Sequence, residues 1–259
     1  MSDEMSYHKR RSEVPSSPTG APPPINELPP APAGVPLQIR DWRKAYLNMK
    51  EPFLKEEAML EDPFLQFDLW FKDVSERKDM SFEEVNAVCL STCRDNRPSS
   101  RMVLMKQYDP EGYSFYSNDS SRKGQDIAAN PNGAMLFYWP AVSRQVRIEG
   151  VIEKLPTSAA DEYWASRPIH SRIGSKASAQ GTVVPSREVL EAEKARLEKV
   201  AATEGEKAIT RPPSWIGFIL KPTYYEFWQG QSNRLHDRII YNLVIDGEKK
   251  TWVRHRLAP

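Results

Sequence analysis

The stretch that most constrains the fold is residues 144–155, near the middle of the chain. Val146, Ile148 and Ile152 alternate there with charged side chains such as Arg147 and Glu149. Because successive side chains of a β-strand point to opposite faces, this period of two gives one apolar face and one polar face. The stretch therefore predicts a strand that is buried on one side only.

Other short segments of β-forming composition accompany this strand, and turn residues separate them. Residues 94–98 and 109–112 carry the Asp, Asn, Pro and Gly that tight turns favour. The predicted strands are 85–93, 99–106, 113–117, 133–139, 144–155, 214–220, 224–228, 238–245 and 251–256. Many short strands with turns between them predict a mainly β fold, an antiparallel barrel.

Four helices are expected beside the strands. Asp62 as a cap and Pro63 in the first position begin the first helix. Its apolar stripe is typical of core packing and consists of Phe64, Phe67, Leu69, Trp70, Phe71 and Val74. A second helix has a capped start within 120–127. Thr157 or Ser158 caps a third, and Ser186 begins a fourth that runs over 188–202.

Composition excludes several classes of protein. The 259 residues carry a formal net charge of +1, which argues against nucleic-acid binding by bulk electrostatics. No apolar run is long enough to span a membrane, and residues 1–11 lack the apolar core of a signal peptide. Cys89 and Cys93 lie four residues apart, which is neither a redox nor a zinc spacing. We expect a cytoplasmic protein with two reduced, buried thiols.

Residues 1–38 differ from the rest of the chain because they are rich in Pro, Ser and Ala. A segment of this composition cannot bury enough apolar surface to offset the entropy lost on ordering. We predict a disordered tail, with a proline-rich docking motif as the alternative.

The most distinctive stretch is 225–238, in which an aromatic run is followed by a Gly-, Ser- and Asn-containing turn. Beyond the turn, Arg234, His236 and Arg238 are spaced two apart. In an extended chain they would project from one face, near Trp228 on the preceding strand. Such a face suits a planar anionic ligand. The alternative is a solvated hairpin in which Asp237 pairs with an arginine.

Two further clusters suit phosphate groups. Arg122 and Lys123 lie at a predicted helix start, where backbone N–H groups and the helix dipole favour anions. Tyr163 and Arg167 are four apart and so share one helical face, after which Pro168 ends the helix and leaves Ser171 on a loop. The alternative for both clusters is ordinary solvated charge. No dinucleotide-binding glycine motif, Ser-His-Asp string or Cys/His metal spacing is present, so no metal site is predicted.

The string EFWQGQSNRLHDR, residues 226–238, closely resembles the C-terminal signature of pyridoxine 5′-phosphate oxidases, and the resemblance extends from about Ile39 to the last residue. It implies an FMN-binding split barrel of Greek-key type over residues 39–259, with peripheral helices. It also implies a homodimer that binds each flavin at the subunit interface. An Arg-x-x-Tyr element in this family covers the active site, which implies a lid containing Arg43 and Tyr46.

The resemblance also implies roles for individual residues. The cofactor-binding positions are Arg101, Met102, Val103, Leu104, Tyr116, Ser117, Arg122, Lys123, Gln145, Gln180, Gly181, Trp228 and Arg238. The substrate-binding positions are Lys106, Tyr163, Arg167, Ser171, Arg234 and His236. Arg234 and His236 are the expected catalytic residues. The family usually has a Gln-Ser-Ser run where this chain has Gln180-Gly181-Thr182, so the backbone N–H of Gly181 or the hydroxyl of Thr182 would replace a serine hydroxyl.

The implied reaction is oxidation of pyridoxine 5′-phosphate or pyridoxamine 5′-phosphate to pyridoxal 5′-phosphate. A hydride passes from the 4′ carbon to FMN, and O2 is reduced to H2O2. One alternative is a split-barrel protein that binds flavin or pyridoxal phosphate without turnover. A second is a reductase of the same fold that uses a nicotinamide cofactor, although no nucleotide motif supports it.

Overall fold

The computed structural model describes residues 53–78 and 84–259. The predicted tail, residues 1–38, and the predicted lid residues Arg43 and Tyr46 lie outside the described residues. Within the described part, no helix is long and apolar enough to cross a membrane.

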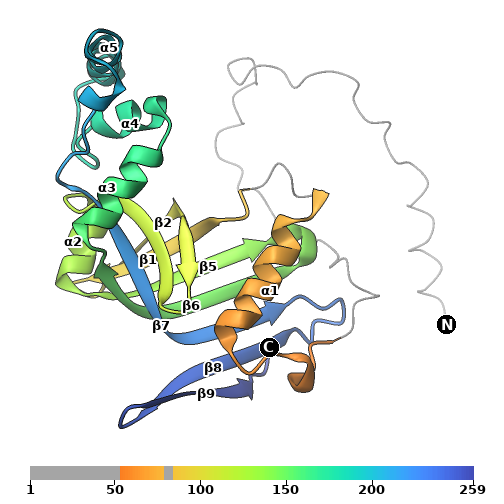
Figure 1. The fold of residues 1–259 in the computed structure, drawn as a ribbon. Helices are drawn as coiled ribbons and strands as arrows, with labels where there is room; N and C mark the ends of the chain where they lie inside the picture. Colours follow the sequence, from red (N-terminus) through yellow and green to blue (C-terminus); the bar gives the residue numbers. More distant parts are fainter. Residues whose placement is uncertain (1–52, 79–83) are drawn as a thin grey trace, which may run out of the picture. The chain divides into compact units, whose positions relative to one another are not determined.

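In residues 53–78 and 84–259, nine antiparallel strands form one sheet (Figure 1). Its order is β2-β1-β5-β6-β7-β4-β3, and β8 and β9 extend it from β7. The strands are β1 Ala87–Arg94, β2 Arg97–Leu104, β3 Gln107–Asp109, β4 Gly112–Asn118, β5 Asn132–Trp139, β6 Arg144–Lys154, β7 Trp215–Gln229, β8 Asp237–Asp246 and β9 Lys249–Arg256. The mainly β prediction is confirmed, and only the three-residue strand β3 was not expected.

Five α-helices lie outside the sheet, in the part of the chain that the structure describes. They are α1 Pro63–Ser75, α2 Arg122–Ala129, α3 Thr157–Ser166, α4 Ile169–Lys176 and α5 Arg187–Glu204, with 3-10 turns η2 Glu56–Ala58, η4 Pro140–Val142 and η5 Glu206–Ala208. Asp62 caps α1 through the backbone N–H of Phe64, and Ser121 caps α2 through that of Gly124, as predicted. The cap predicted at Thr157 or Ser158 is wrong, because α3 begins at Thr157 behind Pro156 without a side-chain cap.

The main core lies between α1 and the sheet. Val146, Ile148 and Ile152 of β6 are buried, which confirms the inward face predicted from their alternation. Phe67 of α1 is fully buried, and its ring centroid lies 4.8 Å from that of Tyr113. The stripe predicted on α1 is core at Phe67, Trp70, Phe71 and Val74, whereas Phe64 is half-buried outside the core cluster and Leu69 is 53% exposed.

The two strands predicted at 214–220 and 224–228 are one continuous strand, β7. The predicted gap contains Pro222, which has no N–H to donate, and a register shift there accommodates it, with Glu149 opposite Tyr224 and Gly150 opposite Pro222. A side chain at Gly150 would overlap the carbonyl oxygen of Lys221, so glycine allows the two strands this close approach. This unbroken strand determines where the halves of the predicted site lie.

A second, smaller core holds the helices α3, α4 and α5 against the start of β7. Its buried residues are Trp164, Ile173, Leu197, Ile209 and Trp215. Trp215 is the first residue of β7, so this cluster fixes the helices to one end of that strand. Cys89 and Cys93 form no disulfide, and both are half-buried rather than buried as predicted, because β1 exposes the face on which they lie.

Candidate functional site

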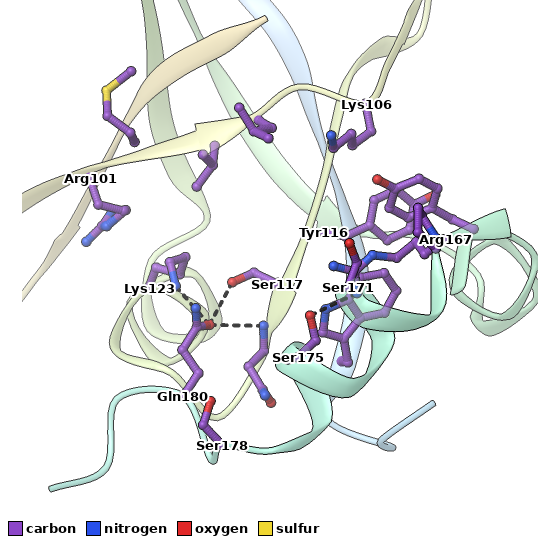
Figure 2. Close-up of a pocket in the computed structure, with 18 residues that line it drawn as sticks. Arg101, Lys106, Tyr116, Ser117, Lys123, Arg167, Ser171, Ser175, Ser178 and Gln180 are labelled. Carbon is purple, nitrogen blue, oxygen red and sulfur yellow. Dashed lines mark hydrogen bonds between the residues drawn. The ribbon is translucent and has the colours of Figure 1, made fainter. Parts of the chain in front are cut away.

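A cavity of about 840 Å³ opens where β2 and β4 diverge without pairing. Arg101, Met102, Val103 and Leu104 of β2 line one wall, and Tyr116, Ser117 and Asn118 of β4 line another. Helices α3 and α4 close the far side (Figure 2). The volume lies in the range of pockets that hold a small molecule and its cofactor.

One side of the cavity is organised by the side-chain oxygen of Gln180. It accepts from the hydroxyl of Ser117 at 3.1 Å, from the Nζ of Lys123 at 3.2 Å and from the backbone N–H of Asn118 at 3.4 Å (Figure 2). Lys123 Nζ also donates to Ser121 Oγ, the cap of α2, at 3.2 Å. Burial, and then the nearby Arg101, lower the pKa of Lys123. A partly desolvated ammonium beside a helix start is a strong site for a phosphate.

Arg101 is held from behind by oxygen atoms of β1 and β2. Its Nη1 donates to the Leu90 carbonyl at 3.1 Å and to Thr92 Oγ1 at 2.8 Å, and its Nη2 donates to Ser99 Oγ at 2.8 Å. Burial lowers the pKa of Arg101, whereas Asp126 opposes the shift. The side chain is thus fixed at the wall of the cavity before any ligand binds.

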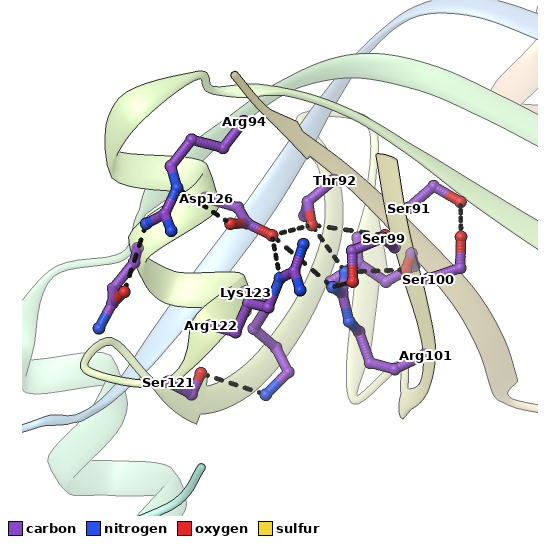
Figure 3. A network of polar contacts seen from close by, with 12 residues as sticks. Ser91, Thr92, Arg94, Ser99, Ser100, Arg101, Ser121, Arg122, Lys123 and Asp126 are labelled. Carbon is purple, nitrogen blue, oxygen red and sulfur yellow. Dashed lines mark hydrogen bonds and ion pairs between the residues drawn. The ribbon is translucent and has the colours of Figure 1, made fainter. Parts of the chain in front are cut away.

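A buried carboxylate, Asp126 of α2, lies behind this wall (Figure 3). Thr92 Oγ1 donates to its Oδ2 at 2.8 Å. Three guanidinium groups surround it at 3.7 to 3.8 Å, those of Arg94, Arg101 and Arg122. These distances are too long for hydrogen bonds, so Asp126 gathers the positive charges without binding one of them directly.

Arg122 and Gly181 do not line the main cavity but a smaller hollow of about 380 Å³, and Gln180 lines both. Gly181 has a φ of +89°, a left-handed conformation that favours glycine over the serine usual in the resembled family. A Cβ there would lie 3.9 Å from the backbone nitrogen of Arg122, so Gly181 approaches the start of α2. The hydroxyl of Thr182 donates to the Ala179 carbonyl at 2.8 Å and turns back into its own loop.

The other side of the cavity holds Lys106, Tyr163, Arg167 and Ser171 (Figure 2). Arg167 lies over the ring of Trp215, with its central carbon 5.0 Å from the ring centroid, and its Nη1 donates to Ser175 Oγ at 2.9 Å. Burial lowers the pKa of Arg167. Since arginine keeps its charge regardless, this desolvated guanidinium is poised to bind an anion.

The local structure around Arg167 differs from the prediction. Arg167 is the extended C-cap of α3 rather than a helical neighbour of Tyr163. Pro168 ends that helix but begins the next, because its fixed φ also suits the position before a first turn. Ser171 therefore lies in α4 and not on a loop. The three side chains still line the same cavity.

The remaining predicted residues lie at the opposite end of β7. Gln145 is paired in register with Trp228, and Arg238 follows on β8. Thirteen residues separate Trp215, in the cavity, from Trp228, which at about 3.3 Å per residue is roughly 40 Å along the strand. Figure 1 shows α3 to α5 beyond one end of β7 and β8 and β9 beside the other. One copy of the chain thus divides the predicted site residues between two places.

The predicted extended face of Arg234, His236 and Arg238 is wrong. Arg234 has a φ of +69° and its N–H donates to the Gln231 carbonyl at 3.1 Å, so it lies in a turn. Strand β8 begins only at Asp237. The Gly-, Ser- and Asn-containing turn is longer than the spacing suggested. Trp228 and His236 nevertheless meet, with ring centroids 5.0 Å apart.

Arg238 is fixed by a second buried carboxylate, that of Glu226 on β7. Its Nε donates to Glu226 Oε1 at 2.7 Å, and its Nη1 donates to the Ala258 carbonyl at 3.0 Å. Arg147 Nη2 donates to Glu226 Oε2 at 2.6 Å. Burial alone would raise the pKa of Glu226, but the bonds from Arg238 and Arg147 outweigh it and lower the pKa.

Comparison with known sequences gives a consistent result. Residues 76–201 match the family model described as pyridoxamine 5′-phosphate oxidase, and residues 215–259 match the pyridoxine 5′-phosphate oxidase C-terminal dimerisation region. A Caenorhabditis elegans protein that carries the family name is 53% identical over 225 residues, covering 86% of this chain and 98% of its own. The pyridoxine-5′-phosphate oxidase of Bos taurus is 40% identical over 238 residues, covering 87% and 89%.

This chain belongs to the pyridoxine/pyridoxamine 5′-phosphate oxidase family.

Solved structures support the same fold. PhzG from Burkholderia lata, in complex with tetrahydrophenazine-1-carboxylic acid, has a TM-score of 0.71 and 29% identity, covering 81% of this chain and 98% of its own. A pyridoxamine 5′-phosphate oxidase-related, FMN-binding protein from Nostoc punctiforme has a TM-score of 0.58 at 15% identity, covering 78% and 100%, and shows the shared fold alone. The predicted split barrel is thereby confirmed.

The two family matches cover different parts of the predicted site. The first covers the segments that build the cavity, except Trp215, and also includes Gln145 of β6. The second covers β7, β8 and the loop between them, and so includes Trp228, Arg234, His236 and Arg238. The family's dimerisation region therefore carries most of the predicted residues that do not line the cavity.

The structure also adds residues to the oxidase cavity that sequence reasoning missed. Asn118, Ser175, Ser178 and Trp215 line it beside the predicted residues. Trp215 lies in the predicted strand 214–220, whereas Ser175 lies in a segment for which the sequence predicts no helix and no role. The signal that could have found Ser175 is its spacing of four from Ser171, which places both on one face of α4.

Proposed function

We propose that this protein oxidises pyridoxine 5′-phosphate and pyridoxamine 5′-phosphate to pyridoxal 5′-phosphate with FMN as cofactor and O2 as electron acceptor. The observation that carries this proposal is one cavity with two separate cationic groups, Arg101 with Lys123 and Lys106 with Arg167. Two such groups match one phosphorylated cofactor and one phosphorylated substrate bound side by side.

The residues of the Gln180 side fit FMN. Arg101 and Lys123 would hold its phosphate at the start of α2, with Arg122 reaching it from the adjoining hollow. Gly181, with its backbone close to Arg122, leaves room for a phosphate oxygen where a longer side chain would stand. FMN, when bound, supplies the acceptor for the hydride and the route of electrons to O2. The protein's part is to position FMN and the substrate and to exclude water from the site.

On the other side, Lys106, Tyr163, Arg167 and Ser171 would hold the substrate phosphate. Arg167 is already fixed by Ser175 and by the ring of Trp215, so little side-chain entropy is lost when the anion binds. Fixing the phosphate orients the substrate ring and its 4′ carbon against the flavin. The amine substrate additionally consumes water and releases ammonia, so that both substrates give the same aldehyde.

We further propose that the complete site is shared between two copies of the chain in a homodimer. Trp228, Arg238 and Gln145 would complete the flavin site, and Arg234 and His236 the substrate site, of the partner's cavity. The separation of roughly 40 Å along β7 supports this arrangement, because it prevents one chain from supplying both halves. In a two-fold dimer, the end of β7 near Trp228 in each chain completes the cavity of the other chain, which yields two equal sites.

The first test is an absorption spectrum of the purified protein followed by a peroxide assay. We expect a flavin band, and H2O2 with pyridoxine 5′-phosphate but far less with pyridoxine, which lacks the phosphate. A flavin band without peroxide would favour a binding protein, and rapid anaerobic bleaching by NADPH would favour a reductase. Equal turnover of substrates with and without phosphate would contradict the role given to Lys106 and Arg167.

A further inference from the structure

The loop between β7 and β8 fixes the imidazole of His236 in one state. The backbone N–H of Gln231 donates to His236 Nδ1 at 3.0 Å. A backbone N–H can only donate, so Nδ1 must present its lone pair, and the proton of the neutral ring must lie on Nε2. The hydrogen bond thus selects one tautomer of the ring.

The loop that makes this bond is itself held at several points. Gln231 is 3% exposed, and its Nε2 donates to Asp237 Oδ2 at 2.7 Å. Arg256 Nη1 of β9 donates to Asp237 Oδ1 at 2.7 Å. Because Gln231 is anchored through Asp237 to β9, its backbone N–H cannot easily turn away from His236. The selected tautomer is therefore a property of the folded loop.

The surroundings also oppose a positive charge on His236. Burial, and then Arg234, lower its pKa, and Asp237 offsets only part of that effect. Lys55 and Arg256 line the same hollow, but Arg256 is paired with Asp237 and Glu56, so Arg234 is the cation that matters for His236. A protonated ring would also direct an N–H from Nδ1 at the Gln231 N–H. Geometry and charge both favour the neutral ring.

We infer that His236 serves the reaction as a neutral hydrogen-bond donor through Nε2–H and does not act as a general base. This inference deepens the proposed function, on which its catalytic meaning rests. A base would need a lone pair on Nε2, which would place the proton on Nδ1 against the Gln231 N–H. The group that His236 recognises is therefore an acceptor on the substrate, and the proton lost from the 4′ hydroxyl or amine leaves by another route.

The tautomer can be measured without any turnover. In the full-length protein with 15N-labelled histidine, two-bond 1H–15N spectra distinguish a protonated ring nitrogen from an unprotonated one. His236→Leu assigns the signals by their loss among the four histidines. We expect protonated Nε2 and unprotonated Nδ1 near neutral pH. The reverse pattern, or two averaged nitrogens, would overturn the inference even if the proposed oxidase activity fails.

Kinetics then separates a donor from a base. His236→Gln keeps an N–H donor and should lose less kcat/KM than His236→Leu, which should lose about two- to tenfold. A loss of about a hundredfold or more in both variants is the signature of a missing base and would contradict the inference. His255→Leu makes the same change on exposed β9 and is the control. Bound flavin measured in each variant shows that the cofactor site is intact.

Discussion

The two ends of β7 each hold a buried carboxylate among arginines, yet the two clusters are built differently. At the end of β7 near Trp228, the far end, Glu226 accepts direct bonds from Arg147 at 2.6 Å and Arg238 at 2.7 Å. At the end near Trp215 and the cavity, the near end, the guanidinium nitrogens of three arginines lie 3.7 to 3.8 Å from the carboxylate of Asp126, which accepts a side-chain hydrogen bond from Thr92. Glu226 fixes its two guanidiniums by direct bonds, whereas Asp126 attracts the arginines near it without bonding them, and Arg101 is held by Leu90, Thr92 and Ser99 instead. The near end is thus suited to receive an anion, and the far end to present guanidiniums held rigidly by a carboxylate.

The strongest test of this comparison places one substitution at each end of β7. Arg167→Ala removes an arginine from the cavity, and Arg234→Ala removes one from the loop between β7 and β8. If the ends of two chains meet in one site, a heterodimer of these variants has one intact site of its two. Random exchange makes about half of the dimers hybrid, so mixing the inactive variants should restore about a quarter of the wild-type turnover.

The control for mixing is a pair of variants with defects at the same end. Lys106→Ala with Arg167→Ala leaves every cavity damaged, and no activity should return. Recovery in this control, or no recovery between the two ends after subunit exchange is shown by mass, would mean that the site is not shared.

The second prediction separates the roles of two arginines at the far end. Arg234→Ala should lower kcat/KM by roughly ten- to a hundredfold through the loss of a charge-assisted bond, with flavin content unchanged. Arg238→Ala should lose flavin first, and added FMN should restore part of its turnover. Bound flavin is measured by absorbance before each assay. Normal turnover of Arg234→Ala with saturating FMN would remove Arg234 from the substrate side.

The comparison also shows which features could be read from the sequence. The alternation of Val146 and Ile148 predicts β6 correctly, since burial of one face depends only on local periodicity. The caps at Asp62 and Ser121 are equally local and were predicted. By contrast, the gap predicted between residues 220 and 224 is wrong, because the register shift that accommodates Pro222 depends on pairing with β6 and has no local signal.

The site follows the same division. Residues of the types suited to phosphate can be named from the sequence, but the partners that hold them cannot. Thr92, Ser175 and Glu226 act through contacts with residues 9, 8 and 12 positions away, and no motif links these pairs. The sequence predicts an extended chain at Arg234 because spacing by two is its only local signal, whereas its left-handed backbone depends on the turn closed by Gln231.

The smallest predicted effect compares the two carboxylates directly. Glu226→Gln should lower the free energy of unfolding by about 1.5–3 kcal/mol, because the amide loses the charge that both arginines bond and directs an N–H at one of them. Asp126→Asn should lower it by less than Glu226→Gln does. The amide oxygen still accepts from Thr92, and no direct arginine bond is lost, because the guanidiniums lie 3.7 to 3.8 Å away.

Urea unfolding of both variants at one protein concentration gives this comparison, since a dimer's stability depends on concentration. The two carboxylates are similarly buried, at 5% exposure for Glu226 and 0% for Asp126, so burial alone predicts that Asp126→Asn has the larger effect. Direct bonding predicts the opposite order. If Asp126→Asn destabilises as much as Glu226→Gln, the arginines at the near end are as firmly bound as those at the far end. The distinction between an anion-binding end and a rigid end of β7 would then be wrong.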